Sequence, residues 1–173
     1  MQGLMMDYQL NVPAILRRGD ELFGDREIVS RLPDKSWHRY TYAEFASRAK
    51  RLAVALRGLG LAEGDRVGTL MWNHHEHLET YIGAPVGGFV THTLNLRLHP
   101  DDNTYIATHG GDRVILVDKT LWPLAEQFVP RCAAEEQRNA SARRRRRGTL
   151  AIVHLHGQRR LCRQPEASAT WTC

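Results

Sequence analysis

The sequence predicts an α/β fold in which a mostly parallel sheet is covered by helices and is preceded by a short β-hairpin. Strand-like and helix-like segments alternate between residues 65 and 128, which is typical of parallel strands joined by helical crossovers. The strand segments, DRVILVD above all, are too apolar to leave one face in water. The turns between the segments are short, as they are in compact domains.

The first element is a helix in NVPAILRRGDELFGD. Asn11 can cap its start, and Gly24 marks its end. The spacing predicts one apolar helix face, made of Ile15, Leu16, Leu22 and Phe23.

The next segments predict a hairpin followed by a second helix. EIVSRL and SWHRYTY are two short strands, and PDKS is the turn between them. Thr41 and Glu44 form a capping box, in which each side chain satisfies a free backbone N–H group of the other. Gly58 and Gly60 end this helix. Its expected apolar face consists of Phe45, Ala49, Leu52, Ala53 and Leu56.

Regular alternation follows. DRVGTLM, FVTHTLN and DRVILVD are the expected strands, and NHHEHLETYIGAPVG and HPDDNTYIATH are the helices between them. Pro100 stands early in the first turn of the second of these helices, where proline is tolerated. KTLWPLAEQF begins a further helix, which Pro123 is expected to limit.

Composition changes abruptly near Arg131. Residues 131–173 carry ten arginines and three glutamates, whereas residues 1–130 carry 14 basic and 16 acidic side chains. The net charge of +5 and the pI of about 9.4 therefore come from the end of the chain. One apolar patch, TLAIVHL, interrupts a segment without sustained periodicity. We therefore expect an ordered partial domain over residues 1–130 and a disordered basic tail over residues 131–173.

Several protein classes are disfavoured. The three cysteines, Cys132, Cys162 and Cys173, all lie in the tail, and an odd count without repeated spacing argues against a disulfide framework. The first ten residues do not resemble a signal peptide. Apolar runs such as residues 84–90 are too short to cross a bilayer. A cytoplasmic location is the default expectation.

Two motifs suggest ligand sites and have simpler interpretations. GLGLAEG (Gly58, Gly60, Gly64) follows a helix and precedes a strand, which is the reverse of a dinucleotide loop, so it is interpreted as a helix end plus a turn. NHHEH places His74 and His77 on one helix face but offers no third convergent metal ligand. The polar start of a helix is the favoured interpretation.

The tail offers two further candidates. His154 and His156 with Cys132 or Cys162 form a nominal ligand set, but their spacing matches no usual zinc pattern. Five consecutive arginines, 143–147, could bind nucleic acid or an anionic surface through charge alone. They lack interleaved aromatic residues. No G-x-S-x-G motif or P-loop is present, and we assign no catalytic, cofactor-binding or metal-binding residue.

Residues 5–130 closely resemble the N-terminus of fatty acyl-CoA synthetases of the adenylate-forming superfamily. The most specific segments are TYAEF, GDRVGTLMWN, HTLNLRLHPDD and GDRVILVD. The resemblance implies an incomplete N-terminal subdomain of a long-chain fatty-acid–CoA ligase. The family converts a fatty acid and ATP to an acyl-adenylate, which CoA then converts to the thioester, with Mg²⁺ offsetting the phosphate charge.

The same resemblance implies that this chain is truncated and not catalytic by itself. The family relies on a phosphate loop ending in Pro-Lys-Gly, an aromatic-Gly-x-Thr-Glu segment, a ribose-binding Asp and a lid Lys, and these motifs are not found here. The resemblance is expected to stop between Phe128 and Arg131. The tail is then interpreted as out-of-frame translation, with a genuine tail as the alternative. Two other roles remain open, a basic module binding nucleic acid or an anionic surface, and a homo-oligomeric or dimerisation partner of a full-length synthetase.

Overall fold

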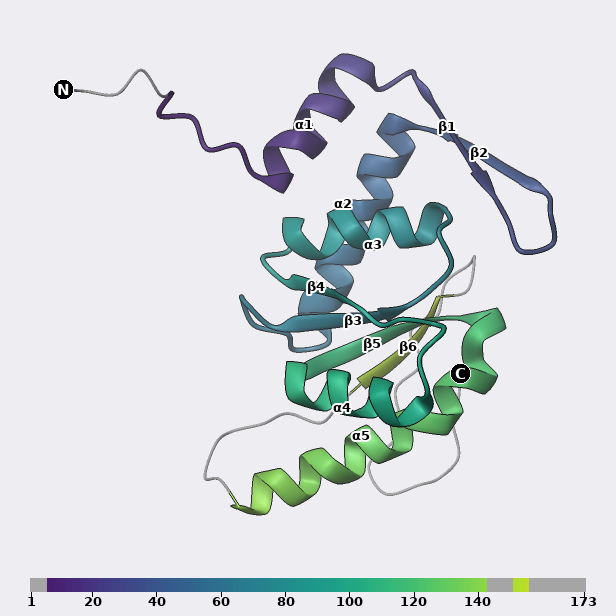
Figure 1. The fold of residues 1–173 in the computed structure, drawn as a ribbon. Helices are drawn as coiled ribbons and strands as arrows, with labels where there is room; N and C mark the ends of the chain where they lie inside the picture. Colours follow the sequence, from purple (N-terminus) through teal and green to yellow (C-terminus); the bar gives the residue numbers. More distant parts are fainter. Residues whose placement is uncertain (1–5, 143–150, 156–173) are drawn as a thin grey trace.

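The computed structural model describes residues 6–142 and 151–155, with side chains described for residues 6–135 (Figure 1). The helices are α1 (Val12–Phe23), α2 (Tyr42–Gly58), α3 (His75–Val86), α4 (Pro100–Gly110), the short 3₁₀ helix η1 (Lys119–Leu121) and α5 (Trp122–Ala142). The strands are β1 (Glu27–Arg31), β2 (Trp37–Thr41), β3 (Arg66–Leu70), β4 (Val90–Thr93), β5 (Asp112–Asp118) and β6 (Ala151–Leu155). The predicted α/β class is confirmed.

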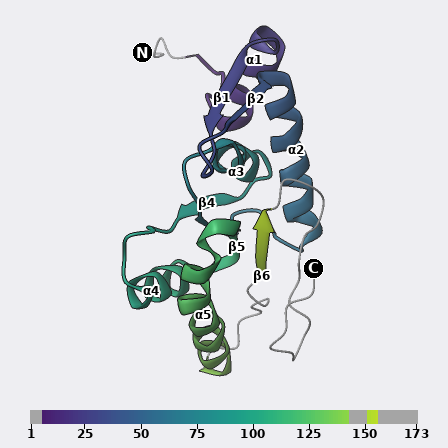
Figure 2. The same cartoon turned by 90° about the vertical axis from the view of Figure 1, so that its right-hand side faces the viewer.

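The described strands form two sheets. β1 and β2 make an antiparallel hairpin in which Val29 pairs with Arg39. The larger sheet is parallel and has the order β4-β3-β5-β6. Helices α2 and α3 lie on one face of this sheet and α4 and α5 on the other (Figures 1 and 2). This layering covers both faces of the central strands, as their apolar sequences require.

Strand β5 supplies both faces of the core because successive side chains of a strand point to opposite sides. Val114 and Leu116 pack with Leu56 of α2 and Ala84 of α3. Ile115 and Val117 face the other way, into a cluster with helices α4 and α5 that contains Phe128. All four of these β5 side chains have no exposed surface. The DRVILVD segment is therefore the centre of the fold.

A third cluster joins α1, the hairpin and α2, and contains Leu16, Tyr40 and Phe45. The predicted caps are confirmed: Asn11 Oδ1 accepts a hydrogen bond from Ala14 N, and Thr41 and Glu44 form the capping box. The predicted apolar face of α1 is wrong in part. Leu16 is buried, but Ile15, Leu22 and Phe23 are exposed, because α1 contacts the rest of the chain along a narrow stripe.

Helix α5 extends further than the sequence suggests. Pro123 does not limit it, because this proline lies in the first helical turn, where backbone N–H groups have no partner inside the helix. The helix also continues through Arg131 to Ala142, along residues rich in helix formers such as alanine, glutamate and glutamine. The side chain of Cys132 is buried against Thr104 of α4, and Arg131 forms an ion pair with Asp101 of α4.

The described tail residues therefore differ from the expectation of disorder. Residues 131–142 are helical, and Ala151–Leu155 form β6, which pairs in parallel with β5. Residues 143–150 and 156–173 lie outside the described part of the chain. The boundary that composition places at Arg131 is thus not a boundary of secondary structure. The out-of-frame origin of the tail stays a prediction.

Candidate functional site

The carboxyl ends of β3 and β5 meet because the two strands are parallel neighbours. In open α/β sheets this edge is where ligands usually bind. The loop after β3 leads into α3 and carries His74, while β5 ends at Asp118. His74 Nε2 lies 2.5 Å from Asp118 Oδ2, and both side chains are buried. Two residues 44 positions apart in sequence thus form one hydrogen-bonded pair.

Asp118 is held by several donors. Its Oδ1 accepts hydrogen bonds from Thr120 N at 2.8 Å and from Thr120 Oγ1 at 2.7 Å. Trp72 Nε1 lies 2.9 Å from Thr120 Oγ1 and donates to it. Burial alone would raise the pKa of Asp118, but the hydrogen bonds from His74 and Thr120 outweigh burial and lower it. Asp118 is therefore an ionised acceptor at neutral pH.

His74 also caps helix α3. Its Nδ1 accepts a hydrogen bond from Glu76 N at 3.3 Å, which in the neutral ring leaves the proton on Nε2, facing Asp118. Burial opposes a charge on this ring, but the hydrogen bond and charge of Asp118, with the charge of Glu76, raise the pKa of His74. The pair fastens the start of α3 to the end of β5. Because both side chains are mostly buried and bonded to each other, the pair serves to position this edge of the sheet.

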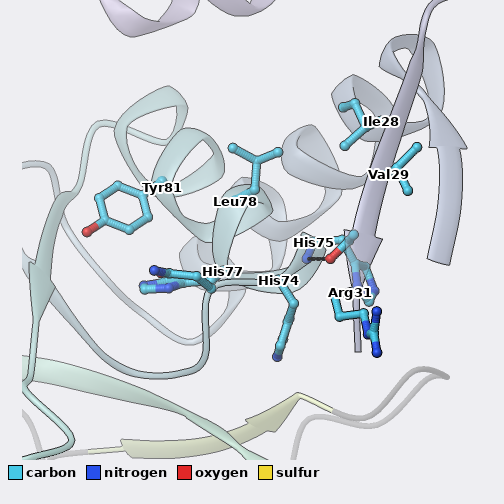
Figure 3. Close-up of a pocket in the computed structure, with 10 residues that line it drawn as sticks. Ile28, Val29, Arg31, His74, His75, His77, Leu78 and Tyr81 are labelled. Atoms are coloured by element: carbon cyan, nitrogen blue, oxygen red, sulfur yellow. Dashed lines mark hydrogen bonds between the residues drawn. The ribbon is translucent and has the colours of Figure 1, made fainter. Parts of the chain in front are cut away.

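A hollow of about 330 Å³ lies beside this pair, between β1 and α3 (Figure 3). Leu78 and Tyr81 of α3 and Ile28 and Val29 of β1 supply its apolar walls. Its polar walls consist of Ser30, Arg31, Asn73, His74, His75 and His77. This division of the walls suits a small ligand that has an apolar part and a polar part.

The three histidines of NHHEH have separate environments. His74 pairs with Asp118, His75 stacks on His38 of β2, and His77 Nε2 lies 3.2 Å from Thr69 Oγ1. The interpretation of NHHEH as the polar start of a helix agrees with the structure. Among the residues whose side chains are described, no group of three or more histidine, cysteine, aspartate or glutamate side chains could hold a metal ion.

The glycine motif also agrees with its simpler interpretation. Gly58 is the last residue of α2, and Gly60 and Gly64 have φ angles of 87° and 81° in the turn that leads to β3. Such positive φ angles favour glycine. The motif is therefore a helix end plus a turn.

The tail candidates are mostly outside the described residues. Arg143–Arg147, His156 and Cys162 lie there, and His154 is placed only through the backbone of β6. Cys132 is buried on α5, and burial raises the pKa of its thiol to about 11. A buried neutral thiol of this kind is a packing group.

Sequence reasoning missed Asp118 as a site residue. A carboxylate at the last position of a buried parallel strand was the available signal, because such positions face the ligand edge of a sheet. The sequence did not reveal which residue of a distant loop would pair with it. It also did not reveal that the hairpin would close one side of a hollow.

The AMP-binding enzyme family matches residues 16–169 of this chain. A long-chain-fatty-acid–CoA ligase of Thermus thermophilus is 50% identical over 122 residues, which are 70% of this chain and 23% of that relative. A medium-chain-fatty-acid–CoA ligase of Ectopseudomonas oleovorans is 34% identical over 164 residues, or 91% of this chain and 30% of the relative. Similarity thus extends past Arg131, where the resemblance was expected to stop.

A solved structure of a related protein is also similar to this chain. The N-terminal domain of FACL13 from Mycobacterium tuberculosis matches 68% of this chain with a TM-score of 0.62 and 28% identity, and the match covers 30% of that protein chain. This chain therefore spans about a quarter to a third of the length of the relatives named here. From the match over residues 16–169, the chain belongs to the AMP-binding enzyme family.

Proposed function

We propose that this chain is the N-terminal part of a fatty-acid–CoA ligase. The reaction would be activation of a fatty acid by ATP to an acyl-adenylate, followed by transfer of the acyl group to CoA. The observation that carries the proposal is the 50% identity to the Thermus thermophilus long-chain ligase over 122 residues. Fatty acid, ATP, Mg²⁺ and CoA would then be the ligands of the complete enzyme.

We further propose that residues 1–173 do not catalyse this reaction alone. The phosphate loop, the aromatic-Gly-x-Thr-Glu segment and the lid lysine motif are not found in the sequence. The His74–Asp118 pair does not replace them, because the two side chains are almost fully buried and bonded to each other. We accordingly assign no catalytic, cofactor-binding or metal-binding residue. The contribution of this segment would be structural: it would supply part of the parallel sheet, with the carboxyl ends of β3 and β5 held together by the His74–Asp118 pair.

Within the described residues, no helix is long and apolar enough to cross a membrane. A cytoplasmic location stays a prediction. Association with a second ligase chain and binding of nucleic acid by Arg143–Arg147 also stay predictions, and co-purification and salt-dependent DNA binding would test them.

A chimera tests the family assignment. Residues 6–128 of this chain would replace the matching segment of the Thermus thermophilus ligase, with the unmodified enzyme as the control. We expect the chimera to form acyl-CoA from a fatty acid, ATP and CoA, because the exchanged segments share their fold and half of their residues. A chimera that folds, as judged by circular dichroism, but forms no acyl-CoA would contradict the proposal.

A second assay tests the inactivity of the chain itself. Purified chain is incubated with fatty acid, Mg-ATP and labelled pyrophosphate, and incorporation of label into ATP is measured. We expect exchange at background, beside robust exchange by the intact Thermus thermophilus enzyme. Fatty-acid-dependent exchange above background would show that residues 1–173 hold an adenylation site.

A further inference from the structure

The β1–β2 hairpin contacts α3 through two stacked histidine rings. The rings of His38 on β2 and His75 on α3 have centroids 3.9 Å apart and planes inclined by 24°. Beside them, Ser30 Oγ of β1 accepts a hydrogen bond from His75 N at 2.9 Å. The ring of Tyr40 meets His75 edge-on at 5.9 Å. This small group of contacts holds the hairpin against the start of α3.

Both rings carry a buried nitrogen atom without a hydrogen-bond partner among the described residues. These atoms are His38 Nε2 and His75 Nδ1. A proton added to His75 Nδ1 would create a buried charge with no acceptor, which is costly in a protein interior. Two neutral rings can stack face to face, whereas two charged rings would repel each other.

The surrounding groups do not compensate such a charge. Arg48 of α2 faces the pair and is engaged by Glu79 of α3 at 2.6 Å. On the other side, His74 is engaged by Asp118 of β5.

The remaining neighbours are the hydroxyls of Ser30 and Tyr40, Arg31 of β1, which lines the same hollow, and Glu76, which lies 4.0 Å from His74 Nδ1. Burial, together with the nearby His38, His74 and Arg48, lowers the pKa of His75 to about 3.

We propose that His38 and His75 form a pH-sensitive latch, which holds the β1–β2 hairpin on α3 at neutral pH and holds it more weakly in mild acid. Strand β1 is one wall of the hollow beside His74, so release of the hairpin opens that hollow. The latch is independent of the proposed ligase activity, because it rests only on contacts within this chain.

The direction follows from proton linkage. In the closed state His75 stays neutral down to a pH of about 3, whereas in the released state it regains an ordinary pKa near 6.5. The released state therefore binds more protons between these values, and acid favours it. Between pH 7.5 and pH 5 the opening equilibrium constant should rise by about 30-fold.

Hydrogen–deuterium exchange of the full chain tests this expectation. Exchange of the hairpin amides is compared at pH 7.5 and pH 5 after correction for intrinsic rates, with the amides of β5 as the internal reference. The wild type should show an increase of about 30-fold in hairpin opening and little change in β5. An unchanged hairpin would overturn the proposal.

Two variants isolate the histidine pair. His75→Phe keeps an aromatic ring and the backbone N–H group but cannot be charged, so hairpin opening should change less than about threefold over the same pH range. His109→Phe is the matched control, because His109 is an exposed histidine stacked on Tyr105, and it should respond as the wild type does. A His75→Phe variant with the full wild-type response would overturn the latch.

A measurement on the wild type decides the matter if His75→Phe does not fold. The ring signals of His75 are followed by NMR from pH 7.5 to pH 4.5 while hairpin amide shifts report closure. A neutral His75 ring in the closed state at pH 5 supports the latch. A closed state in which His75 titrates near 6.5 overturns it.

Discussion

Gly68 lies in the middle of β3 and has no side chain, so side chains of the two flanking strands, β4 and β5, can form a hydrogen bond above it. His92 Nδ1 of β4 lies 2.7 Å from Asp112 Oδ1 of β5, on either side of β3. A Cβ atom at Gly68 would lie 2.7 Å from Asp112 Oδ2 and 3.1 Å from Ile115 Cγ1. The first distance is shorter than van der Waals packing allows and the second is tight, so Gly68→Ala must displace the Asp112 side chain or shift β3 itself.

The expected change in the free energy of unfolding follows from these contacts. Overpacking a well-packed core costs about 1–3 kcal/mol. If Asp112 moves instead, the hydrogen bond to His92 is lost, and a hydrogen bond to a charged group contributes about 1.5–3 kcal/mol. The better strand-forming tendency of alanine offsets less than about 1 kcal/mol. Gly68→Ala should therefore lower the free energy of unfolding by about 1–2 kcal/mol.

Gly58→Ala is the matched control. A Cβ atom at Gly58 meets nothing within 4 Å, and the residue ends α2, so this substitution should raise the free energy of unfolding by a few tenths of a kcal/mol, about 0.5 at most. Urea denaturation followed by circular dichroism measures both variants. If Gly68→Ala is as stable as the wild type, or if Gly58→Ala loses as much stability, the steric argument is refuted.

Three further predictions concern ionisable side chains. Asp118→Ala leaves His74 buried without its partner and should cost about 3 kcal/mol in urea denaturation, whereas Asp101→Ala breaks an exposed pair and should cost little. Burial raises the pKa of Asp112 to about 6, so the folded chain holds this proton more tightly than the unfolded chain, and the group's contribution to stability is lost as pH rises from about 4 to 6. Asp112→Asn should remove that loss, so the difference between the urea midpoints of this variant and the wild type should change between pH 4 and pH 7; a difference that stays constant would show that the assignment to Asp112 is wrong. Cys132, with a pKa of about 11, should react with iodoacetamide at pH 8 only on unfolding, and peptide mass spectrometry that finds it alkylated as fast as glutathione would contradict this.

Local chemistry explains which parts of the fold the sequence could predict. The caps at Asn11 and Thr41 involve residues three positions apart, so the pattern contains both partners. The parallel sheet follows from uninterrupted apolar strands such as β5. The exposure of Ile15 and Leu22 on α1 could not be predicted. Helical spacing places both residues on the apolar face, but it does not give the width of the surface that α1 buries against α2 and the hairpin.

Long-range contacts explain what the sequence could not predict. The His74–Asp118 pair and the His38–His75 stack join residues 44 and 37 positions apart, and they exist only after the sheet and hairpin are placed. The extent of α5 was missed for a related reason. Burial of the α5 residue Cys132 against α4 and the ion pair between Arg131 and Asp101 stabilise α5 beyond the point where composition changes.

The strand order has a consequence for synthesis on the ribosome. β4 is the first strand that can pair with β3. The other side of β3 pairs with β5, and Asp112 of β5 follows its partner Arg66 by 46 residues in the sequence. At about 5–20 residues per second, a nascent chain would display one open side of β3 for about 2–9 s. During that interval Val67 and Leu70 lack their partners on β5 and the helices beyond it. The emerging chain is thus exposed to chaperones and to aggregation until DRVILVD leaves the exit tunnel.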